Sequence, residues 1–329
     1  MDNLKKLRNE IDKIDEKILE LLDRRMAIAS EIGRIKRNLG IPIEDIKREE
    51  EILNKAGIYR EIFKKILEHS KRIQERHYIP NRLDGSIGII GYGRMGKLFT
   101  RIFREYLDVY IYDIDPKKYD SEKGKICKSM NELLDKSEYI MVATDLYSIS
   151  NVLKRIKSLI VRYGFRDKYI FDIATIKDEV INILKSFPHY VNVCSIHPLF
   201  GPNISTHHGE RIIIIPIEDR MDEASTIADL FREMGFRVIY SDLDIHEYAM
   251  AYLITLPHII GYIYGEVIKD SGINIDTYLT KSGEYFLKYY RDVVMEDGER
   301  FLSKIVRTSH GLEAINRYVK KILSYLENQ

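Results

Sequence analysis

The first 36 residues carry an apolar side chain at every third or fourth position, which predicts one long helix over residues 4–36. The apolar positions are Leu4, Leu7, Ile11, Ile14, Ile18, Leu21, Ile28, Ile32 and Ile35. This spacing is typical of a coiled-coil seam, in which each side chain packs against a neighbouring helix. Arg25 interrupts the seam. Because a guanidinium among apolar side chains is costly without an anion, Arg25 should meet either an acid on a partner helix or the carboxylate of a ligand.

Two shorter helices are predicted after the break at Pro42. The first opens at Asp45-Ile46-Lys47-Arg48-Glu49, and the second runs from about Arg60 to His77. Ser70 and Gln74 extend an apolar i, i+4 row of the second helix with hydrogen-bonding groups. Three helices of this kind predict a small bundle with polar groups gathered on one inner face.

Three cations of this region are spaced for one anionic ligand. Lys36 follows Arg25 on almost the same face of the long helix, roughly 16 Å further along the axis. Arg8 precedes Arg25 by roughly 25 Å, so it can reach the same site only from another subunit. The pattern therefore favours a ligand carboxylate beside Arg25, and it predicts an intertwined dimer.

Composition narrows the classes of partner. The chain has 52 Lys and Arg against 51 Asp and Glu, a net charge of +1, which argues against nucleic acid or an anionic membrane. Cys127 and Cys194 lie in hydrophobic runs, so neither a disulfide framework nor a metal site is predicted. No signal peptide is recognised, and the uncharged stretch Tyr248–Gly265 is interpreted as a buried dimer helix rather than a membrane span. We expect a cytoplasmic protein with small-molecule ligands.

From residue 85 the pattern changes to alternating strands and helices. A buried strand at Ile87–Ile90 leads into Gly91-Tyr92-Gly93-Arg94-Met95-Gly96 and an amphipathic helix, and a second strand ends in Asp113. This context predicts a dinucleotide site, in which the glycines let the backbone approach the pyrophosphate. Asp113 should accept hydrogen bonds from the ribose hydroxyls and repel a 2′-phosphate, so NAD is the expected cofactor.

Further apolar runs extend a doubly wound sheet to about residue 242: Tyr139–Val142, Tyr169–Asp172, Val191–Ile196, Ile212–Ile217 and Arg237–Tyr240. The third of them leads directly into His197. A histidine at the C-terminal end of such a strand faces the crevice where ligands bind. Imidazole is also suited to take a proton from an alcohol as a hydride leaves. We therefore predict that His197 is catalytic.

Residues 1 to about 78 resemble the all-helical chorismate mutases at each position where that family contacts its ligand: Arg8, Arg25, Lys36, Asp45, Arg48, Glu49, Ser70 and Gln74. The resemblance implies that Arg25 and the partner subunit's Arg8 hold the two carboxylates of chorismate. Lys36 and Gln74 would face the ether oxygen, and Glu49 the ring hydroxyl, while the remaining three complete the polar shell. Such a site suits a unimolecular rearrangement, which needs positioned cations rather than an acid, a base or a nucleophile.

Residues from Gly85 onward resemble the prephenate dehydrogenases, through the loop His197–Pro202, the turn Asp172–Lys177 and Leu256-Pro257-His258. The resemblance implies that His197 bonds the ring hydroxyl of prephenate during hydride transfer to NAD. It also implies that His258 and Arg291 hold the substrate. Where that family has a serine after the fourth strand, this chain has Ala143-Thr144-Asp145. Thr144 can supply the hydroxyl, and Asp145 has no assigned role.

The expected protein is a bifunctional chorismate mutase–prephenate dehydrogenase and a homodimer. It should have a helical mutase bundle at 1–80, an NAD-binding Rossmann domain at 85–242 and an all-α substrate and dimerisation domain at 243–329. Two alternatives stay open. One is a dehydrogenase whose N-terminal bundle only dimerises, which leaves Arg25, Lys36, Ser70 and Gln74 without a purpose. The other is a dehydrogenase for a different acid, including arogenate, the amino counterpart of prephenate, although His258 favours prephenate.

Overall fold

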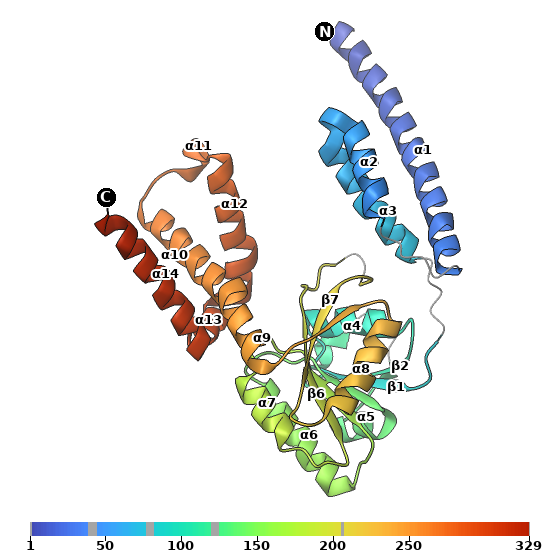
Figure 1. The fold of residues 1–329 in the computed structure, drawn as a ribbon, viewed down its shortest axis with the longest axis vertical. Coiled ribbons are helices and arrows are strands. Elements are labelled where there is room, and N and C mark those ends of the chain that lie inside the picture. Colours follow the sequence, from blue (N-terminus) through green and yellow to red (C-terminus); the bar gives the residue numbers. More distant parts are fainter. Residues whose placement is uncertain (1, 39–44, 77–81, 120–124, 205–206, 329) are drawn as a thin grey trace. The chain divides into compact units, whose positions relative to one another are not determined.

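The computed structural model describes residues 2–38, 45–76, 82–119, 125–204 and 207–328 (Figure 1). The chain divides into two compact units, and each is described by itself. Unit 1 comprises Met1–Leu83, Asn203–Glu210 and Glu233–Arg237. Unit 2 comprises Asp84–Pro202, Arg211–Arg232 and Val238–Gln329.

Unit 1 begins with the predicted helices: α1 (Asp2–Asn38), α2 (Ile46–Ala56), the 3₁₀ turn η1 (Gly57–Tyr59) and α3 (Arg60–Arg76). Helices α1 and α3 lie side by side in Figure 1 and pack on each other through Ala29 and Leu67, which are buried. The apolar seam of α1 stays open, because its nine Leu and Ile side chains are 43% to 64% exposed. A helix of this length draws most of its stability from tertiary packing. One chain alone therefore leaves the seam without its packing surface.

Unit 2 is built on a sheet whose described strands have the order β3-β2-β1-β4-β5-β6-β7-β8. The strands are β1 (Ser86–Ile90), β2 (Asp108–Tyr112), β3 (Lys125–Ile126), β4 (Tyr139–Val142), β5 (Tyr169–Asp172), β6 (Asn192–Pro198), β7 (Arg211–Pro216) and β8 (Arg237–Tyr240). The first six pair in parallel and β7 runs antiparallel to β6. This confirms the predicted doubly wound sheet. Its strand order reverses between β1 and β4, the place where such sheets bind dinucleotides.

Helices cover both faces of the sheet: α4 (Arg94–Phe103), α5 (Met130–Lys136), α6 (Ile149–Tyr163), α7 (Asp178–Lys185) and α8 (Met221–Glu233), with the short turn η2 (Pro116–Tyr119) after β2. On one face, α5, α6 and α7 share a core with the strands. On the other face, Phe99 of α4 lies edge-on to Phe231 of α8, with ring centroids 6.4 Å apart. Both faces are thus buried, which explains why the strands read as unbroken apolar runs.

The rest of unit 2 is helical, as predicted: α9 (Leu243–Met250), the π-helical turn η3 (Ala251–Thr255), α10 (Leu256–Asp270), α11 (Ile275–Tyr278), α12 (Lys281–Tyr289), the π-helical turn η4 (Tyr290–Val294), α13 (Met295–Val306) and α14 (Ser309–Glu327). Helix α10 packs on α12, α13 and α14 (Figure 1). Gly265 makes room for this, because a Cβ there would lie 2.4 Å from the ring of Tyr290.

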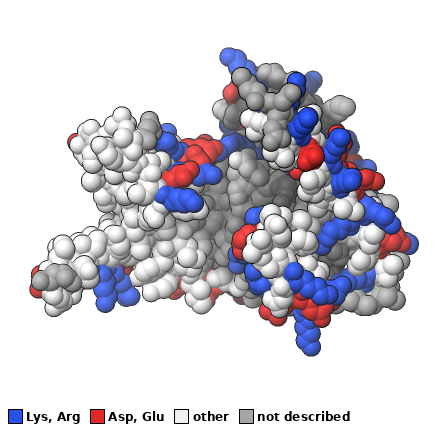
Figure 2. Space-filling model, turned by 90° about the horizontal axis from the view of Figure 1, so that it is seen from above, with Lys and Arg blue, Asp and Glu red and all other residues white. Residues whose placement is uncertain are grey.

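One helical stretch, Leu243–Asp270, is long and apolar enough to cross a membrane by length and composition alone. Only 28% of its most apolar window is buried within the chain. This stretch exposes Leu253 and Val267, and the neighbouring helix α12 exposes Tyr285. Figure 2 shows few charged side chains over these C-terminal helices, whereas blue and red are interspersed elsewhere. Burial of this helix, as interpreted from the sequence, would therefore need a second chain, and it stays a prediction.

Candidate active sites

Unit 1 contains a cavity of about 330 Å³. Six of the eight residues predicted to contact chorismate line it, together with an apolar wall and one unpredicted cation: Arg25, Lys36, Asp45, Arg48, Glu49 and Ser70, then Ile28, Ala29, Ile32, Ile52 and Leu67, and finally Lys71. Polar groups from three helices thus converge on one small hollow, which matches the size and polarity of a compact anion.

Arg25 is held in place by Ser70, a buried residue of α3. Its Nη1 donates to Ser70 Oγ, and Ser70 Oγ in turn donates to the carbonyl of Ile66 at 2.8 Å. Burial lowers the pKa of Arg25 from its ordinary value. A guanidinium nevertheless stays protonated at neutral pH. The cavity wall therefore carries a fixed positive charge whose direction is set from the facing helix.

The acidic residues of this cavity have partners of their own. Glu49 forms an ion pair of 2.8 Å with Lys71, a residue that was not singled out from the sequence. Arg48 pairs with Glu51 at 2.7 Å on the exposed side of α2. Asp45 caps α2, since its side chain accepts from the backbone N–H of Arg48 at 3.0 Å. Asp45 therefore lies at the cavity because the helix starts there.

Two predicted contacts are not part of this cavity. Arg8 lies on α1, exposed, and is absent from the cavity lining within one chain. The backbone of Gln74 belongs to α3, but its side chain lies outside the described residues. Within one chain, the cavity therefore contains Arg25 and Lys36 but lacks Arg8, the arginine predicted to hold the second carboxylate.

The glycine loop of unit 2 joins β1 to α4. Gly91 has φ +102°, and a Cβ there would lie 2.6 Å from the carbonyl of Ala143. At Gly96 a Cβ would lie 2.0 Å from the carbonyl of Gly91, so the loop can close on the helix only with glycine here. Around Gly93, by contrast, nothing lies within 4 Å of a Cβ position. The open side of the loop is therefore the side on which a phosphate can approach the backbone.

A cavity of about 290 Å³ adjoins this loop, lined by Gly91, Gly93, Asp113, Thr144, Asp145 and Arg155 among others. Asp113 Oδ2 accepts from the N–H of Tyr92 at 2.6 Å, and Oδ1 accepts from the N–H of Asp115 at 2.9 Å. The acid thus ties the end of β2 to the glycine loop. Thr144 Oγ1 is buried without a hydrogen-bond partner among the described residues. The lining fits a dinucleotide, because it combines an open glycine loop, an acid after β2 and an unsatisfied hydroxyl.

Asp145, to which the sequence analysis assigns no role, caps the turn that precedes α6. Its Oδ1 accepts from the N–H groups of Tyr147 at 2.9 Å and Ser148 at 3.1 Å. Burial opposes ionisation of the carboxyl, but hydrogen bonds from Ser148 and from these backbone groups outweigh it and lower the pKa of Asp145. The negative charge of Asp145 therefore stabilises the backbone N–H groups of the turn that follows it.

A third cavity of about 560 Å³ lies within unit 2, where the loop after β6 faces the C-terminal helices. It brings together His197 and His258, with Arg94 and Met95 from the glycine loop and Phe301 from α13. Arg94 and Met95, predicted to touch the cofactor, line this cavity rather than the one beside Asp113. Arg291 lies exposed in η4 and is not part of the lining.

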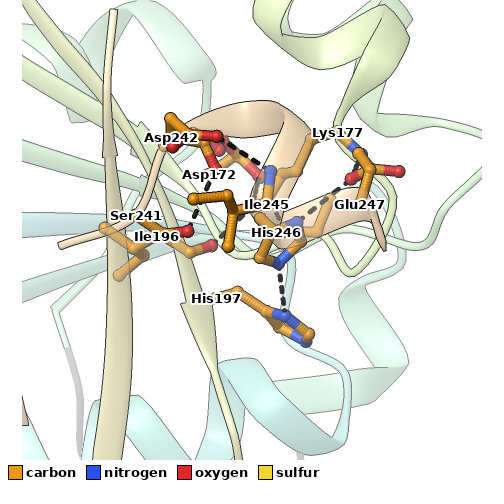
Figure 3. Close-up of polar contacts among 11 residues, drawn as sticks. Asp172, Lys177, Ile196, His197, Ser241, Asp242, Ile245, His246 and Glu247 are labelled. Atoms are coloured by element: carbon orange, nitrogen blue, oxygen red, sulfur yellow. Dashed lines mark hydrogen bonds and ion pairs between the residues drawn. The ribbon is translucent and has the colours of Figure 1, made fainter. Parts of the chain in front are cut away.

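His197 projects from the end of β6 and is buried (Figure 3). Its Nδ1 lies 2.9 Å from Nε2 of His246, whose Nδ1 lies 3.1 Å from Oε1 of Glu247. Burial, then the charge of Lys177 and then His246 lower the pKa of His197 well below its ordinary value. The imidazole is therefore neutral at physiological pH, as a general base must be.

A fully buried ion pair supports this strand end. Lys177 Nζ donates to Asp172 Oδ1 at 2.8 Å and to the carbonyl of Ile196 at 2.6 Å. Ser195 Oγ donates to the other oxygen of Asp172. Burial lowers the pKa of Lys177, while Asp172 opposes that shift. The network fixes the two residues that precede His197, and so fixes the direction of the imidazole.

His258, at the start of α10, has a defined proton position. Its Nδ1 lies 2.7 Å from the carbonyl of Ile254 and 3.2 Å from the hydroxyl of Tyr289. Because a carbonyl only accepts, Nδ1 carries the hydrogen.

Neither His246 nor Glu247 was predicted from the sequence, since they are 49 or more residues from His197 and follow no recognisable spacing.

Known proteins resemble the N-terminal helices and the rest of the chain to different degrees. Residues 7–75 match the family chorismate mutase type II. The chorismate mutase of Methanocaldococcus jannaschii is 34% identical over 88 residues, which cover 23% of this chain and 89% of that protein. The T-protein of Haemophilus influenzae is 23% identical over 349 aligned positions, which cover 100% of this chain and 88% of that protein.

A solved structure resembles unit 2. The prephenate dehydrogenase from Aquifex aeolicus, in complex with hydroxyphenyl propionate and NAD⁺, superposes with a TM-score of 0.63 at 16% identity, covering 74% of this chain and 90% of that one. At this identity the likeness shows the fold. The stronger match lies in the cation-lined bundle, and through these N-terminal helices the chain belongs to the chorismate mutase family.

Proposed function

We propose that the protein catalyses two consecutive steps of tyrosine biosynthesis. Chorismate is rearranged to prephenate in the cavity of unit 1, and prephenate is oxidatively decarboxylated to 4-hydroxyphenylpyruvate in unit 2. The observation that carries the proposal is the presence, in one chain, of a mutase-family cavity lined by Arg25 and Lys36 and of a buried His197 near a dinucleotide-type loop. Similarity to a T-protein over the whole chain supports it.

In unit 1 the reaction needs a compact substrate conformer and positive charge at the breaking C–O bond. Arg25, oriented by Ser70, holds one carboxylate, and Arg8 of the partner subunit holds the other. Lys36 and Gln74 face the ether oxygen, and Glu49 faces the ring hydroxyl. Asp45 and Arg48 complete the polar rim. No group in this set has to gain or lose a proton, which suits a unimolecular rearrangement.

In unit 2 the proton of the prephenate ring hydroxyl passes to His197. The chemistry that bound NAD would supply is acceptance of a hydride from the ring carbon that bears this hydroxyl. The carbonyl formed at that carbon accepts the electrons released as CO₂ leaves, so the ring becomes aromatic. His258 would hold the substrate from the cavity that it shares with His197, whereas the same role for Thr144, which lines the cavity beside Asp113, and for the exposed Arg291 is proposed from the family resemblance alone. Asp113 would hold the ribose of the cofactor and the loop Gly91–Gly96 its pyrophosphate, and Arg94 and Met95 would contact the cofactor from the cavity that they share with His197.

Two copies of the chain form the working enzyme in this proposal. The open seam of α1 and the exposed apolar side chains of the C-terminal helices each need a covering surface. A second copy supplies both, as well as the second arginine of the mutase site. We assign residues 1–80 to the mutase domain, 85–242 to the NAD-binding domain and 243–329 to the dimerisation domain of a cytoplasmic homodimer.

The test supplies chorismate to the full-length protein, first alone and then with NAD, and follows absorbance at both stages. Loss of chorismate without NAD, followed by NADH on its addition, supports both steps in this order. Arg25→Ala should abolish only the first step, and His197→Asn only the second. If chorismate persists while added prephenate yields NADH, the bundle only dimerises. If arogenate alone yields NADH, the substrate assignment is wrong.

A further inference from the structure

A chain of hydrogen bonds runs from His197, which lines the cavity of about 560 Å³, to His246 and Glu247, which are not in its lining (Figure 3). His197 Nδ1 lies 2.9 Å from His246 Nε2, and His246 Nδ1 lies 3.1 Å from Glu247 Oε1. The three residues are 5%, 1% and 6% exposed, so water cannot substitute for these contacts. They come from the end of β6 and from α9, and the proposed catalytic steps leave His246 and Glu247 without a task.

The proton positions along this chain follow from its inner end. Glu247 Oε1 also accepts the backbone N–H of Lys177 at 3.2 Å, which establishes this oxygen as an acceptor. His246 Nδ1 must then carry the hydrogen that faces it. In a neutral His246 the other nitrogen, Nε2, is an acceptor, so His197 Nδ1 donates to it. His197 is therefore protonated on Nδ1, and its Nε2 lone pair is the one left for a substrate.

We propose that His246 and Glu247 fix the tautomer of His197 and share the positive charge that it acquires from the substrate hydroxyl. This inference rests on the proposed dehydrogenase function of unit 2. The hydroxyl proton moves to His197 Nε2, and the Nδ1 proton of His197 moves to His246 Nε2. The charge then resides on His246 beside the Glu247 carboxylate. Two protons move in this step: His197 gains one on Nε2 and gives up the one on Nδ1, so it ends neutral, and His246 gains one on Nε2 and carries the positive charge.

Electrostatics explains why such a partner is needed. The Lys177 ammonium and the low polarity around His197 both disfavour an imidazolium at that position. Asp172 is already paired with Lys177 and accepts a hydrogen bond from Ser195. Glu247 is the anion that faces the histidine chain directly. His246 is thus a positioning residue, because it acts on the substrate only through His197.

The experiment uses the full-length protein with ¹⁵N-labelled histidine. NMR should show His197 protonated on Nδ1 and His246 protonated on Nδ1 at pH 7. His246→Ala should abolish the tautomer preference of His197 and lower kcat for prephenate by about 100-fold, with KM for prephenate little changed. Glu247→Gln keeps an acceptor for both donors but removes the charge, so it should lower kcat while leaving the tautomers as they are.

The matched control is His189→Gln, which replaces an exposed histidine of unit 2 and should change neither kcat nor the remaining signals. Mutase activity and the unfolding temperature of each variant report on folding, and the isosteric Glu247→Gln serves if His246→Ala does not fold. The proposal is overturned if His197 is protonated on Nε2 in the wild type, or if kcat survives both substitutions. A wild type that yields no NADH from prephenate or arogenate overturns the dehydrogenase function instead, and the tautomer measurement still reports on the hydrogen-bond chain.

Discussion

The ammonium of Lys177 lies 2.8 Å from the carboxylate of Asp172, and neither side chain has any exposed surface. The same ammonium donates to the carbonyl of Ile196, the residue before His197. Each charge is thus compensated by the other deep inside unit 2. The pair joins the turn after β5 to the end of β6, where the proposed base projects.

Lys177→Met should strongly destabilise unit 2. Removing one partner of a buried ion pair leaves the other charge uncompensated, which costs about 3–5 kcal/mol. Urea unfolding followed by a probe in unit 2 measures the loss. The control is Lys125→Met, which breaks an exposed ion pair with Asp108 and should leave the midpoint almost unchanged. A Lys177→Met protein as stable as the wild type would show that Asp172 finds another partner or is protonated.

The dehydrogenase should keep its activity at mildly acidic pH. Burial lowers the folded-state pKa of His197 well below 6.5, so the base stays unprotonated as the pH falls through that value. The pH profile of kcat/KM for prephenate should therefore show no loss near pH 6.5 from this group. Mutase activity measured over the same range is the internal control. A decline centred at pH 6.5 in the dehydrogenase alone contradicts the assignment of His197.

The same shift has a consequence for stability. The unfolded state takes up a proton near pH 6.5 whereas the folded state does so only at lower pH. The contribution of His197 to stability is therefore fully present above the unfolded pKa, and is lost as the pH falls toward the folded one. His197→Asn should flatten the dependence of the unfolding free energy on pH between these limits. An unchanged slope would assign the dependence to other groups.

Arg25→Met should abolish the mutase while sparing the dehydrogenase. The substitution removes the fixed charge that Ser70 orients in the cavity of unit 1. Loss of one preorganised donor to developing charge lowers kcat by about 10²–10³-fold. Arg34→Met is the matched control, because Arg34 is an exposed arginine of the same helix that pairs with Glu31. Equal effects of the two substitutions on chorismate turnover would place the site elsewhere.

Substitution by alanine should have different effects on stability at two positions of the glycine loop. Gly96→Ala brings a Cβ within 2.0 Å of the Gly91 carbonyl, so the loop must distort and unit 2 should unfold at a lower temperature. Gly93→Ala meets no protein atom within 4 Å, so it should leave the unfolding temperature nearly unchanged. Its methyl group nevertheless occupies the side where the phosphates approach, and KM for NAD should rise. An unchanged KM in Gly93→Ala would mean that the dinucleotide lies elsewhere.

Mixing two inactive variants tests whether Arg8 acts across the dimer. If Arg8 of the partner subunit completes each site, a mixed dimer of Arg8→Ala and Arg25→Ala chains contains one intact site. Equal amounts, unfolded together and refolded, should regain about a quarter of the wild-type mutase activity by random pairing. Each variant refolded alone is the control. No regained activity would place Arg8 outside the site, or in the same chain.

Local patterns predicted the features that depend on neighbours in sequence. The seam of α1 follows from a three- and four-residue spacing, and the loop Gly91–Gly96 from a strand before it and a helix after it. Both features can be predicted from short segments, because the geometry of a helix and of a strand–turn–helix unit depends on residues close together in the sequence. His197 could be predicted for the same reason, since it ends a recognisable apolar strand.

Contacts between distant segments were missed. His246 meets His197 across 49 positions, and Glu49 meets Lys71 from the next helix. Neither sequence separation corresponds to the repeat of a helix or a strand, so neither contact can be predicted from a periodic pattern. Asp145 was also without a role, because its capping bonds depend on the backbone turn that follows β4. The sequence thus predicts which segments line these cavities, whereas the partners of their charged groups are set by the tertiary fold.

If a second chain packs on the exposed seam of α1, as proposed, the first reaction depends on protein concentration. If each mutase site borrows Arg8 from a second chain, its formation is bimolecular in protein, and dilution below the dissociation constant of the pair removes sites without altering any chain. His197, His246 and Glu247, by contrast, meet within one unit of one chain. The two turnover numbers should then diverge as the enzyme is diluted, with chorismate turnover declining first.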